Sequence, residues 1–399
     1  MAETDFAVPK GFKAAACSSG IKKSGKLDLA LIYSDKPVDC AGVFTTNKVV
    51  AAPVKLTESR MRQGLCQAIL VNSGNANACT GAQGLQDARR CGELVALSMD
   101  IAPEMVAVSS TGVIGVPLPM YCFEEHVPTL CRMLAPDQFE GVARAMMTTD
   151  AFPKASGRTV NVGNQQVHLL GMAKGAGMIH PDMATMLSFV LTDAVLADNL
   201  LEESLRRAVD ASFNRITVDR DTSTNDMVLL LASGEANNEE IVTGSPELEQ
   251  FDRALNEIML DLAKMIARDG EGATKLVRIQ VNGAASDEDA LLAARSVATS
   301  QLVKTAFFGE DANWGRIIAA IGYSGADVDA EQVSIMFDDV LMVTKGLGLG
   351  SEQEAKASEI LKKSEFTVTV DLALGEGSAY YFTSDLSYDY VKINADYRT

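Results

Sequence analysis

The spacing of apolar residues along the chain predicts a mixed α/β protein. Short runs rich in β-branched and aromatic residues, bounded by Gly, Pro, Asn or Asp, are typical of strands. Such runs occur at residues 67–71, 105–108, 158–162, 166–173, 186–191, 333–336, 365–370 and 379–385. Residues 28–46 carry two further runs on either side of the sequence Ser34-Asp35-Lys36-Pro37, which predicts a hairpin or a pair of neighbouring strands.

Helical spacing, with apolar residues every three or four positions, alternates with these strands. It covers residues 85–98, 123–134, 137–147, 198–211 and 287–300. The longest helix is expected from Pro246 to about residue 266, because Ser245 offers a capping hydroxyl and proline suits the first helical position. A further domain is expected to begin at about residue 285.

Composition narrows the class of protein. With 399 residues, an apolar fraction of 47% and a charged fraction of 22%, the chain is globular and long enough for two or three domains. It has 35 Lys and Arg against 53 Asp and Glu, a formal charge of −18, so its surface repels nucleic acid and anionic membranes. The N-terminal residues do not resemble a signal peptide, and no apolar run is long enough to span a bilayer. We therefore expect a cytoplasmic protein without nucleic-acid or membrane partners.

The cysteine and histidine residues offer few candidates for a metal site or a catalytic triad. The seven cysteines lie between Cys17 and Cys131 without a C-x-x-C pair, and we expect them to be small buried side chains in a reducing compartment. Three histidines leave few candidates for a metal site. Residues 216–228 are rich in oxygen ligands but lack the Gly and terminal Glu of a calcium loop. No metal is expected.

The stretch 174–193, KGAGMIHPDMATMLSFVLTD, joins a loop containing Gly and Pro directly to the strand expected at 186–191. Thr185 opens that strand, and β-propensity alone is the usual explanation for a threonine there. The alternative is chemical: Thr185 Oγ attacks the carbonyl of Ala184, and the resulting ester hydrolyses. Thr185 would then be a chain terminus whose α-amine, with an ordinary pKa of roughly 7.7 to 8.0, deprotonates its own hydroxyl.

Four polar clusters follow predicted elements, and each has an ordinary explanation as a turn or a helix cap. They lie at residues 72–81, 109–112, 148–150 and 269–275. In the second cluster, Thr111 and Gly112 place a hydroxyl beside an unobstructed backbone N–H, which is the donor pair that an oxyanion hole needs. In the fourth, Glu271 stands between two glycines, so a ligand has free access to its carboxylate.

The stretch around Thr185 resembles the autocleavage signature K-G-x-G-M-I-x-P-x-M-A-T-M-L of the ornithine acetyltransferase (glutamate N-acetyltransferase, ArgJ) family, and every fixed position matches. The similarity covers nearly the whole chain and includes the sequences TSTND, GEGATK and K-T-A-x-x-G in order. Ala312 departs from the family, which usually has proline there, and this puts the rigidity of that loop in doubt. The resemblance implies an α/β (α+β) fold, an N-terminal-nucleophile-like sandwich of β-sheets flanked by helices, with a smaller C-terminal α/β domain.

The resemblance also implies what individual residues do. Cleavage between Ala184 and Thr185 would make Thr185 the nucleophile, with Thr111 and Gly112 holding the oxyanion. The substrate-binding residues would be Thr148, Lys174, Thr185, Glu271, Asn394 and Thr399. Residues 1–184 would form an α chain, residues 185–284 the catalytic part of a β chain, and residues 285–399 a C-terminal domain whose tail returns to the site.

The activity implied by the resemblance is a ping-pong transfer of acetyl from N2-acetyl-L-ornithine to L-glutamate through an acetyl-Thr185 intermediate. No cofactor is expected, and the use of acetyl-CoA as a second acetyl donor stays open. The expected partners are these small molecules and the α and β chains themselves, as a heterotetramer of two αβ pairs. Two alternatives remain: an N-terminal-nucleophile amidohydrolase or aminopeptidase that passes the acyl group to water, and a binding or scaffold protein that has kept the fold without activity.

Overall fold

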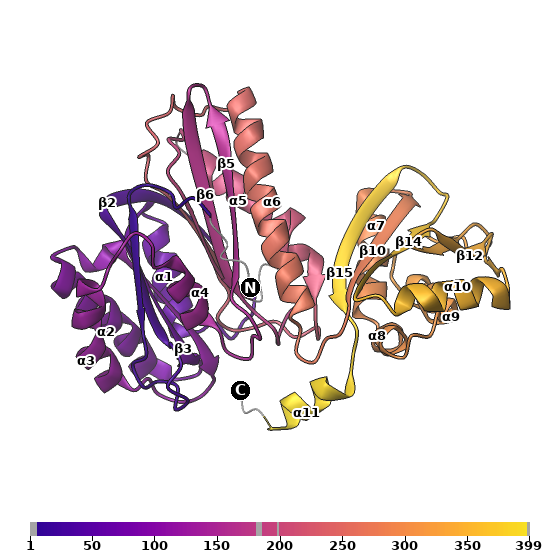
Figure 1. Cartoon of the computed structure of the whole chain (residues 1–399), viewed down its shortest axis with the longest axis horizontal. Helices are drawn as coiled ribbons and strands as arrows, with labels where there is room; N and C mark the ends of the chain where they lie inside the picture. Colours follow the sequence, from indigo (N-terminus) through magenta and orange to yellow (C-terminus); the bar gives the residue numbers. More distant parts are fainter. Residues whose placement is uncertain (1–5, 181–185, 198, 397–399) are drawn as a thin grey trace. The chain divides into compact units, whose positions relative to one another are not determined.

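The computed structural model of the chain describes residues 6–180, 186–197 and 199–396 (Figure 1). These residues divide into two compact units. The first holds residues 6–214 and 221–266, and the second holds residues 215–220 and 267–396. Each unit has its own sheet and its own helices, so each is described by itself.

A mixed sheet forms the centre of the first unit. In the described part of the chain, its strands lie in the order β4-β3-β2-β9-β7-β6-β5, and β1 pairs with β2. The strands are β1 (Phe12–Cys17), β2 (Leu29–Phe44), β3 (Leu65–Asn75), β4 (Val106–Val113), β5 (Lys154–Val162), β6 (Gln165–Lys174), β7 (Leu187–Thr192) and β9 (Met227–Ala232). Every residue of β7 and β9 is buried, as the continuous apolar run at residues 186–191 predicts.

Alternate residues of β2 pack on opposite faces of this sheet, as the two-residue period of a strand requires. Leu29 and Leu31 belong to a core shared with α2 (Gly81–Met99) and α3 (Met120–Arg132). Ile32 belongs to a second core, shared with α4 (Phe139–Met146). Helices therefore cover both faces of the sheet, and α1 (Ala52–Met61) and α5 (Leu200–Ala211) also contact β2.

The long helix α6 (Pro246–Arg268) begins as predicted. The amide of Leu248 donates a hydrogen bond to Ser245 Oγ at 3.1 Å, which is the expected N-terminal cap. The helix lies against β6 (Figure 1), where a Cβ added to Gly171 would come within 2.6 Å of Ile258 Cγ2. Glycine at this strand position therefore allows the helix and the strand to approach closely.

The predicted hairpin or strand pair at residues 28–46 is wrong. β2 is one strand of 16 residues, which pairs with β3 as far as Tyr33 and then shifts its register before Val38. Val38 and Asp39 pair with β3 again, and residues 39–44 also pair with β9 on the other side. Pro37 lies within the shifted stretch and is exposed with its two predecessors, so the absence of an amide hydrogen there leaves no ladder bond unmade.

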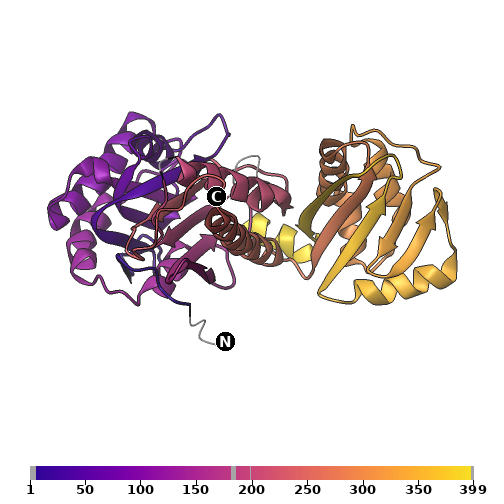
Figure 2. The same ribbon diagram turned by 90° about the horizontal axis from the view of Figure 1, so that it is seen from above.

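The second unit is built on a separate sheet, whose strands lie in the order β13-β12-β11-β14-β10-β15-β8 within the described ranges. The strands are β8 (Ile216–Thr217), β10 (Leu276–Ala284), β11 (Ser334–Phe337), β12 (Val340–Thr344), β13 (Leu347–Gly348), β14 (Glu365–Asp371) and β15 (Gly377–Ser384). The helices are α7 (Asp287–Thr299), α8 (Gln301–Phe308), α9 (Trp314–Gly322), α10 (Ser351–Leu361) and α11 (Tyr388–Asp396). Figure 2 shows this sheet in orange and yellow with helices against it.

The second unit includes more of the chain than the domain expected from residue 285. Besides residues 215–220 it holds the chain from Ala267 onward, and β10, which precedes residue 285, pairs with both β14 and β15. The expected cleavage between residues 184 and 185 would divide the chain within the first unit, and not at the boundary between the two units. The α/β (α+β) class itself is confirmed.

Two further expectations can be compared with the structure. The described cysteines are all free thiols, but Cys79 is exposed and Cys17 is partly exposed, so their expected complete burial is wrong for these two. None of the helices in the described ranges combines the length and the apolarity needed to cross a bilayer.

Candidate active site

Terminal residues of four neighbouring strands of the first unit form one row across the sheet. Lys174 at the end of β6 pairs with Leu187 at the start of β7, and Leu187 pairs with Met227 at the start of β9. Met227 pairs in turn with Phe44 at the end of β2. We refer to these four residues as the strand-end row. The expected nucleophile Thr185 and its neighbour Ala184 lie outside the described residues. In the chain, only Met186 separates Thr185 from Leu187 of this row.

Lys174 of the strand-end row contacts Thr148, and both residues are expected to bind substrate. The Nζ atom of Lys174 donates a hydrogen bond to Thr148 Oγ1 at 2.8 Å. Lys174 is buried, with 7% of its surface exposed, whereas Thr148 is partly exposed. An ammonium group and a hydroxyl placed together in this way form a donor pair suited to a carboxylate.

A buried carboxylate that the sequence did not indicate as functional, Asp150, fixes this pair. Its oxygens accept hydrogen bonds from the amides of Thr148 at 2.9 Å and Gly175 at 2.7 Å, and from Lys154 Nζ at 2.8 Å. Lys174 Nζ lies 3.9 Å from Asp150 Oδ2. Burial opposes the charge of Asp150, but the ammonium groups of Lys174 and Lys154 outweigh it and hold the pKa of this carboxyl well below its usual range.

Lys22 is a second residue near this pair for which the sequence gave no signal. Its Nζ atom donates to the carbonyl oxygens of Met147 at 2.6 Å and Leu27 at 3.0 Å. Burial lowers the pKa of Lys22 to about 8, against the opposing effect of Asp28 and Asp150. Its ammonium group therefore holds the chain in place directly before Thr148.

The two residues expected to form the oxyanion hole lie on β4, which continues through Val113 rather than ending near residue 108. Gly112 has a φ of 132°, and a Cβ on it would lie 2.4 Å from the carbonyl carbon of Gly74 in β3. Only glycine fits this conformation and this contact without strain. Thr111 and Gly112 are both partly exposed.

The segment before β9 links the oxyanion residues to the strand-end row. Asn225 Nδ2 donates to the carbonyl oxygens of Ala76 at 2.6 Å and Ser110 at 2.9 Å. Ser110 is the neighbour of Thr111, and Asn225 lies two residues before Met227 of the row. The TSTND sequence therefore ties β3 and β4 to β9.

Two expected substrate residues meet in the second unit. Asn394 Nδ2 of α11 donates a hydrogen bond to Glu271 Oε2 at 2.8 Å. The loop that carries Glu271 is held by Asp385, whose carboxylate accepts the amides of Thr274 at 2.8 Å and Lys275 at 3.0 Å. Thr399, the remaining expected ligand, lies outside the described residues.

The structure therefore brings the expected residues together in two groups. One is in the first unit, where Thr148 and Lys174 are in contact and Asn225 bonds the carbonyl oxygen of Ser110, the neighbour of Thr111. The other is in the second unit, with Glu271 in contact with Asn394. In the described ranges, no three His, Cys, Asp or Glu side chains are grouped as metal ligands.

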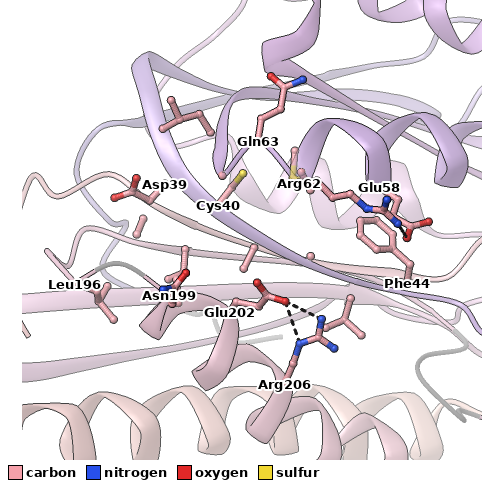
Figure 3. Close-up of a pocket in the computed structure, with 18 of the residues that line it drawn as sticks. Asp39, Cys40, Phe44, Glu58, Arg62, Gln63, Leu196, Asn199, Glu202 and Arg206 are labelled. Carbon is pink, nitrogen blue, oxygen red and sulfur yellow. Dashed lines mark hydrogen bonds and ion pairs between the residues drawn. The ribbon is translucent and has the colours of Figure 1, made fainter. Parts of the chain in front are cut away.

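A separate cavity of about 770 Å³ lies in the first unit between the second half of β2, the turn from α1 to β3, and α5 (Figure 3). Its wall carries the ion pairs Glu58–Arg62 and Glu202–Arg206. None of the expected site residues within the described ranges lines it. Its size suits a small molecule.

Comparison with known proteins identifies the family. A model of the ArgJ family matches residues 13–399. The chain belongs to the ArgJ family. The arginine biosynthesis bifunctional protein ArgJ of Syntrophotalea carbinolica is 61% identical over 389 residues, which is 98% of this chain and 99% of that protein. The protein of the same name from Geobacter sulfurreducens is 55% identical over 390 residues, again 98% of this chain and 99% of that protein.

A solved ArgJ structure shares part of this arrangement. The crystal structure of the arginine biosynthesis bifunctional protein ArgJ from Bacillus halodurans is 47% identical, with a TM-score of 0.52. It covers 53% of this chain and 100% of the solved chain. The expected membership of the ArgJ family is confirmed by these matches.

Proposed function

We propose that this ArgJ family member is a self-cleaving acetyltransferase that moves an acetyl group from N2-acetyl-L-ornithine to L-glutamate. The observation that carries the proposal is the contact between Lys174 and Thr148 beside the strand-end row. Both substrates carry an α-carboxylate, and the buried ammonium with its neighbouring hydroxyl would bind it. The row places this pair next to the start of β7, which Thr185 precedes in the chain.

The chemistry follows from a threonine at a chain terminus. The α-amine of Thr185 would take the proton of its own hydroxyl, and Oγ would attack the acetyl carbonyl of acetylornithine. Thr111 and Gly112 would donate to the oxyanion that forms, and ornithine would leave with the proton. The amine of glutamate would then attack the acetyl-Thr185 ester, which gives N-acetylglutamate and restores the hydroxyl. No metal or organic cofactor enters this cycle.

Glu271 and Asn394 are proposed to bind an amino group of the substrate. Glu271 is a buried residue with 9% of its surface exposed, and its carboxylate is oriented by the Asn394 amide. A carboxylate held in this way would pair with an amino group of ornithine. Thr399 is proposed as a further ligand from the same tail.

The length of the solved relative supports self-cleavage. Its chain is covered completely yet matches only 53% of this one, and 53% of 399 residues is about 211. The segment 185–399 would contain 215 residues. A relative whose solved chain has about this length is what two separate chains would give.

The sheet order explains why the α and β chains would stay together after cleavage. β7 and β9, which follow the cleavage position, lie between β6 and β2, which precede it. Separation would therefore break two strand ladders in the middle of a buried sheet. We propose that the αβ pair is permanent and that two such pairs form a heterotetramer in the cytoplasm.

Acetyl-CoA is proposed as a second acetyl donor. The named relatives are described as bifunctional, and this supports a second activity. Transfer from acetyl-CoA to glutamate would use the same nucleophile and the same oxyanion donors.

The proposal is tested by offering the protein acetylornithine with glutamate, and acetyl-CoA with glutamate, while acetylglutamate is measured by mass spectrometry. Acetylglutamate and ornithine should appear in equal amounts from the first mixture. Release of acetate without acetylglutamate would assign the protein to the amidohydrolases instead. Replacement of Thr185 by Ala should abolish the transfer, and Thr185→Ser should retain some of it.

A further inference from the structure

Asp226 lies directly before β9, beside the strand-end row, and is not among the residues assigned above. Only 2% of its surface is exposed. The amide of the next residue, Met227, donates to the carbonyl oxygen of Met186 at 3.1 Å. Asp226 and Met186 therefore lie next to each other, directly before the paired starts of β9 and β7. Met186 is the residue that follows Thr185 in the chain.

The carboxyl group of Asp226 is incompletely satisfied. The groups that face it are the Ser223 hydroxyl, the Met186 amide and the ammonium of Lys174. Its Oδ2 atom is fully buried, and no described residue makes a hydrogen bond to it. An unpaired buried polar atom costs about 1–3 kcal/mol, so its presence next to Met186 needs an explanation.

Asp226 and Asp150 both lie near Lys174 but in opposite environments. Asp150 accepts hydrogen bonds from two amides and an ammonium group and is ionised. Burial raises the pKa of Asp226 well above its ordinary value, and the Ser223, Lys174 and Met186 groups only reduce this effect. Two carboxyl groups whose environments separate their protonation states are a common arrangement at sites of acid–base chemistry.

We propose that Asp226 is the acid that protonates the departing nitrogen when the chain cleaves itself before Thr185. The inference rests on the proposed function, because it concerns the maturation step of that enzyme. The Met186 amide that faces Asp226 is one residue from the nitrogen that must leave, and consecutive residues are only about 3.8 Å apart. The unpaired Oδ2 atom carries the proton that this nitrogen needs.

In this step the Thr185 hydroxyl oxygen bonds to the Ala184 carbonyl carbon, and the carbon–nitrogen bond breaks. The nitrogen receives the proton of Asp226 and becomes a primary amine, while the proton released by the hydroxyl restores Asp226. Water then hydrolyses the ester, which gives the carboxylate of Ala184 and the free hydroxyl of Thr185. The carboxyl of Asp226 is unchanged at the end.

The test follows cleavage of newly made chains. Wild-type protein and the Asp226→Asn variant are produced by cell-free translation with a short radioactive pulse, and the undivided and divided chains are separated over time on a denaturing gel. Asparagine keeps the shape of a neutral carboxyl but is not an acid. Cleavage of the variant should be slower by about 10²–10⁴-fold, which is the range of general acid catalysis.

Ser188→Ala is the matched control. Ser188 lies on β7 and pairs with Val228 of β9, and its hydroxyl is also buried without a partner in the described ranges. This variant should cleave at the wild-type rate. Circular dichroism and thermal unfolding of each variant verify that it folds, and Asp226→Ser, which is smaller, should show the same arrest if Asn disturbs the fold.

The outcomes separate the two proposals. A folded Asp226→Asn chain that divides as fast as the wild type overturns the role of Asp226 and leaves the acetyltransferase proposal intact. A wild-type chain that never divides overturns the proposed function. Arrest of folded Asp226→Asn and Asp226→Ser with normal cleavage of Ser188→Ala supports the inference.

Discussion

Lys174 Nζ and Thr148 Oγ1 lie 2.8 Å apart although 26 residues separate them in the chain. The first residue ends β6 and the second follows α4, and both are held by the buried carboxylate of Asp150. The pair is therefore arranged by contacts that the protein itself supplies. A site arranged in advance loses little conformational freedom when it binds.

Replacement of Lys174 by Met should weaken substrate binding. A hydrogen bond to a charged group contributes about 1.5–3 kcal/mol, so kcat/KM should fall by roughly 10- to 150-fold, mainly through a higher KM. Steady-state kinetics with acetylornithine as the varied substrate would measure this. The same substitution at the exposed Lys55 of α1 is the control, and equal kinetics for both variants would argue against a role for Lys174.

Replacement of Asp150 by Asn should destabilise the first unit. The side chains of Asp150 and Lys154 are both 0% exposed and are joined at 2.8 Å, so the variant would leave a buried ammonium without its counter-charge. Removal of one partner of a buried ion pair costs about 3–5 kcal/mol. Urea unfolding followed by circular dichroism would detect the loss. A free energy of unfolding within 1 kcal/mol of wild type, on the order of experimental error, would contradict this reading.

The same carboxylate makes stability depend on pH in a defined direction. Because the folded-state pKa of Asp150 is lowered, its contribution is complete above the unfolded pKa of about 3.9 and is lost as the pH falls below that value. Asp150→Asn should therefore lose less stability than wild type when the pH is lowered from about 6 to 3. Urea unfolding curves collected across this range would compare the two.

Gly112→Ala should impair both the fold and the reaction. The added Cβ would lie 2.4 Å from the carbonyl carbon of Gly74, so the end of β4 would have to move. Loss of one oxyanion donor costs roughly 10²–10³ in turnover. Kinetics should show a lower kcat with a nearly unchanged KM. In the control Gly322→Ala, the added Cβ would meet nothing within 4 Å, and kcat should be unaffected.

Lys304 should make the second unit more stable as the pH rises. This residue is 3% exposed, and its Nζ atom donates to Thr383 Oγ1 at 2.9 Å. Burial lowers its pKa from 10.5 to about 7, although Asp385 and Asp219 oppose the shift. Between these values the unfolded chain holds a proton that the folded unit lacks, so stability increases with pH.

The fluorescence of Trp314 can report this effect, because it is the sole tryptophan of the chain and belongs to the second unit. Urea unfolding of the wild type should require more denaturant at about pH 9 than at about pH 6. Lys304→Met should flatten the difference. A wild-type midpoint that does not rise with pH would show that the buried lysine keeps its ordinary pKa.

The elements that the sequence predicted best are those whose local pattern agrees with their burial. The continuous apolar run at residues 186–191 became the buried strand β7, and Ser245 with Pro246 opened α6. The hairpin at residues 28–46 failed because the turn signal at Pro37 was overridden by pairing of β2 with two different strands. α11, which carries Asn394, was missed, and none of its residues is buried.

The site could be predicted only in part, and the missing part is tertiary. Thr148, Lys174, Glu271 and Asn394 were indicated by family motifs, and the structure places them in two contacting pairs. Asp150 and Asp226 differ in protonation because of what surrounds each carboxyl in the fold. Neither residue carries a local sequence signal for that difference.

The most direct test of the account is the intact mass of an active preparation. The protein is purified, its transfer of acetyl from acetylornithine to glutamate is measured, and the same sample is analysed by mass spectrometry under denaturing conditions. We expect two chains, the second beginning with Thr185, and no active material at 42.5 kDa. Full transfer activity in a sample that contains only the undivided 42.5 kDa chain would contradict the account.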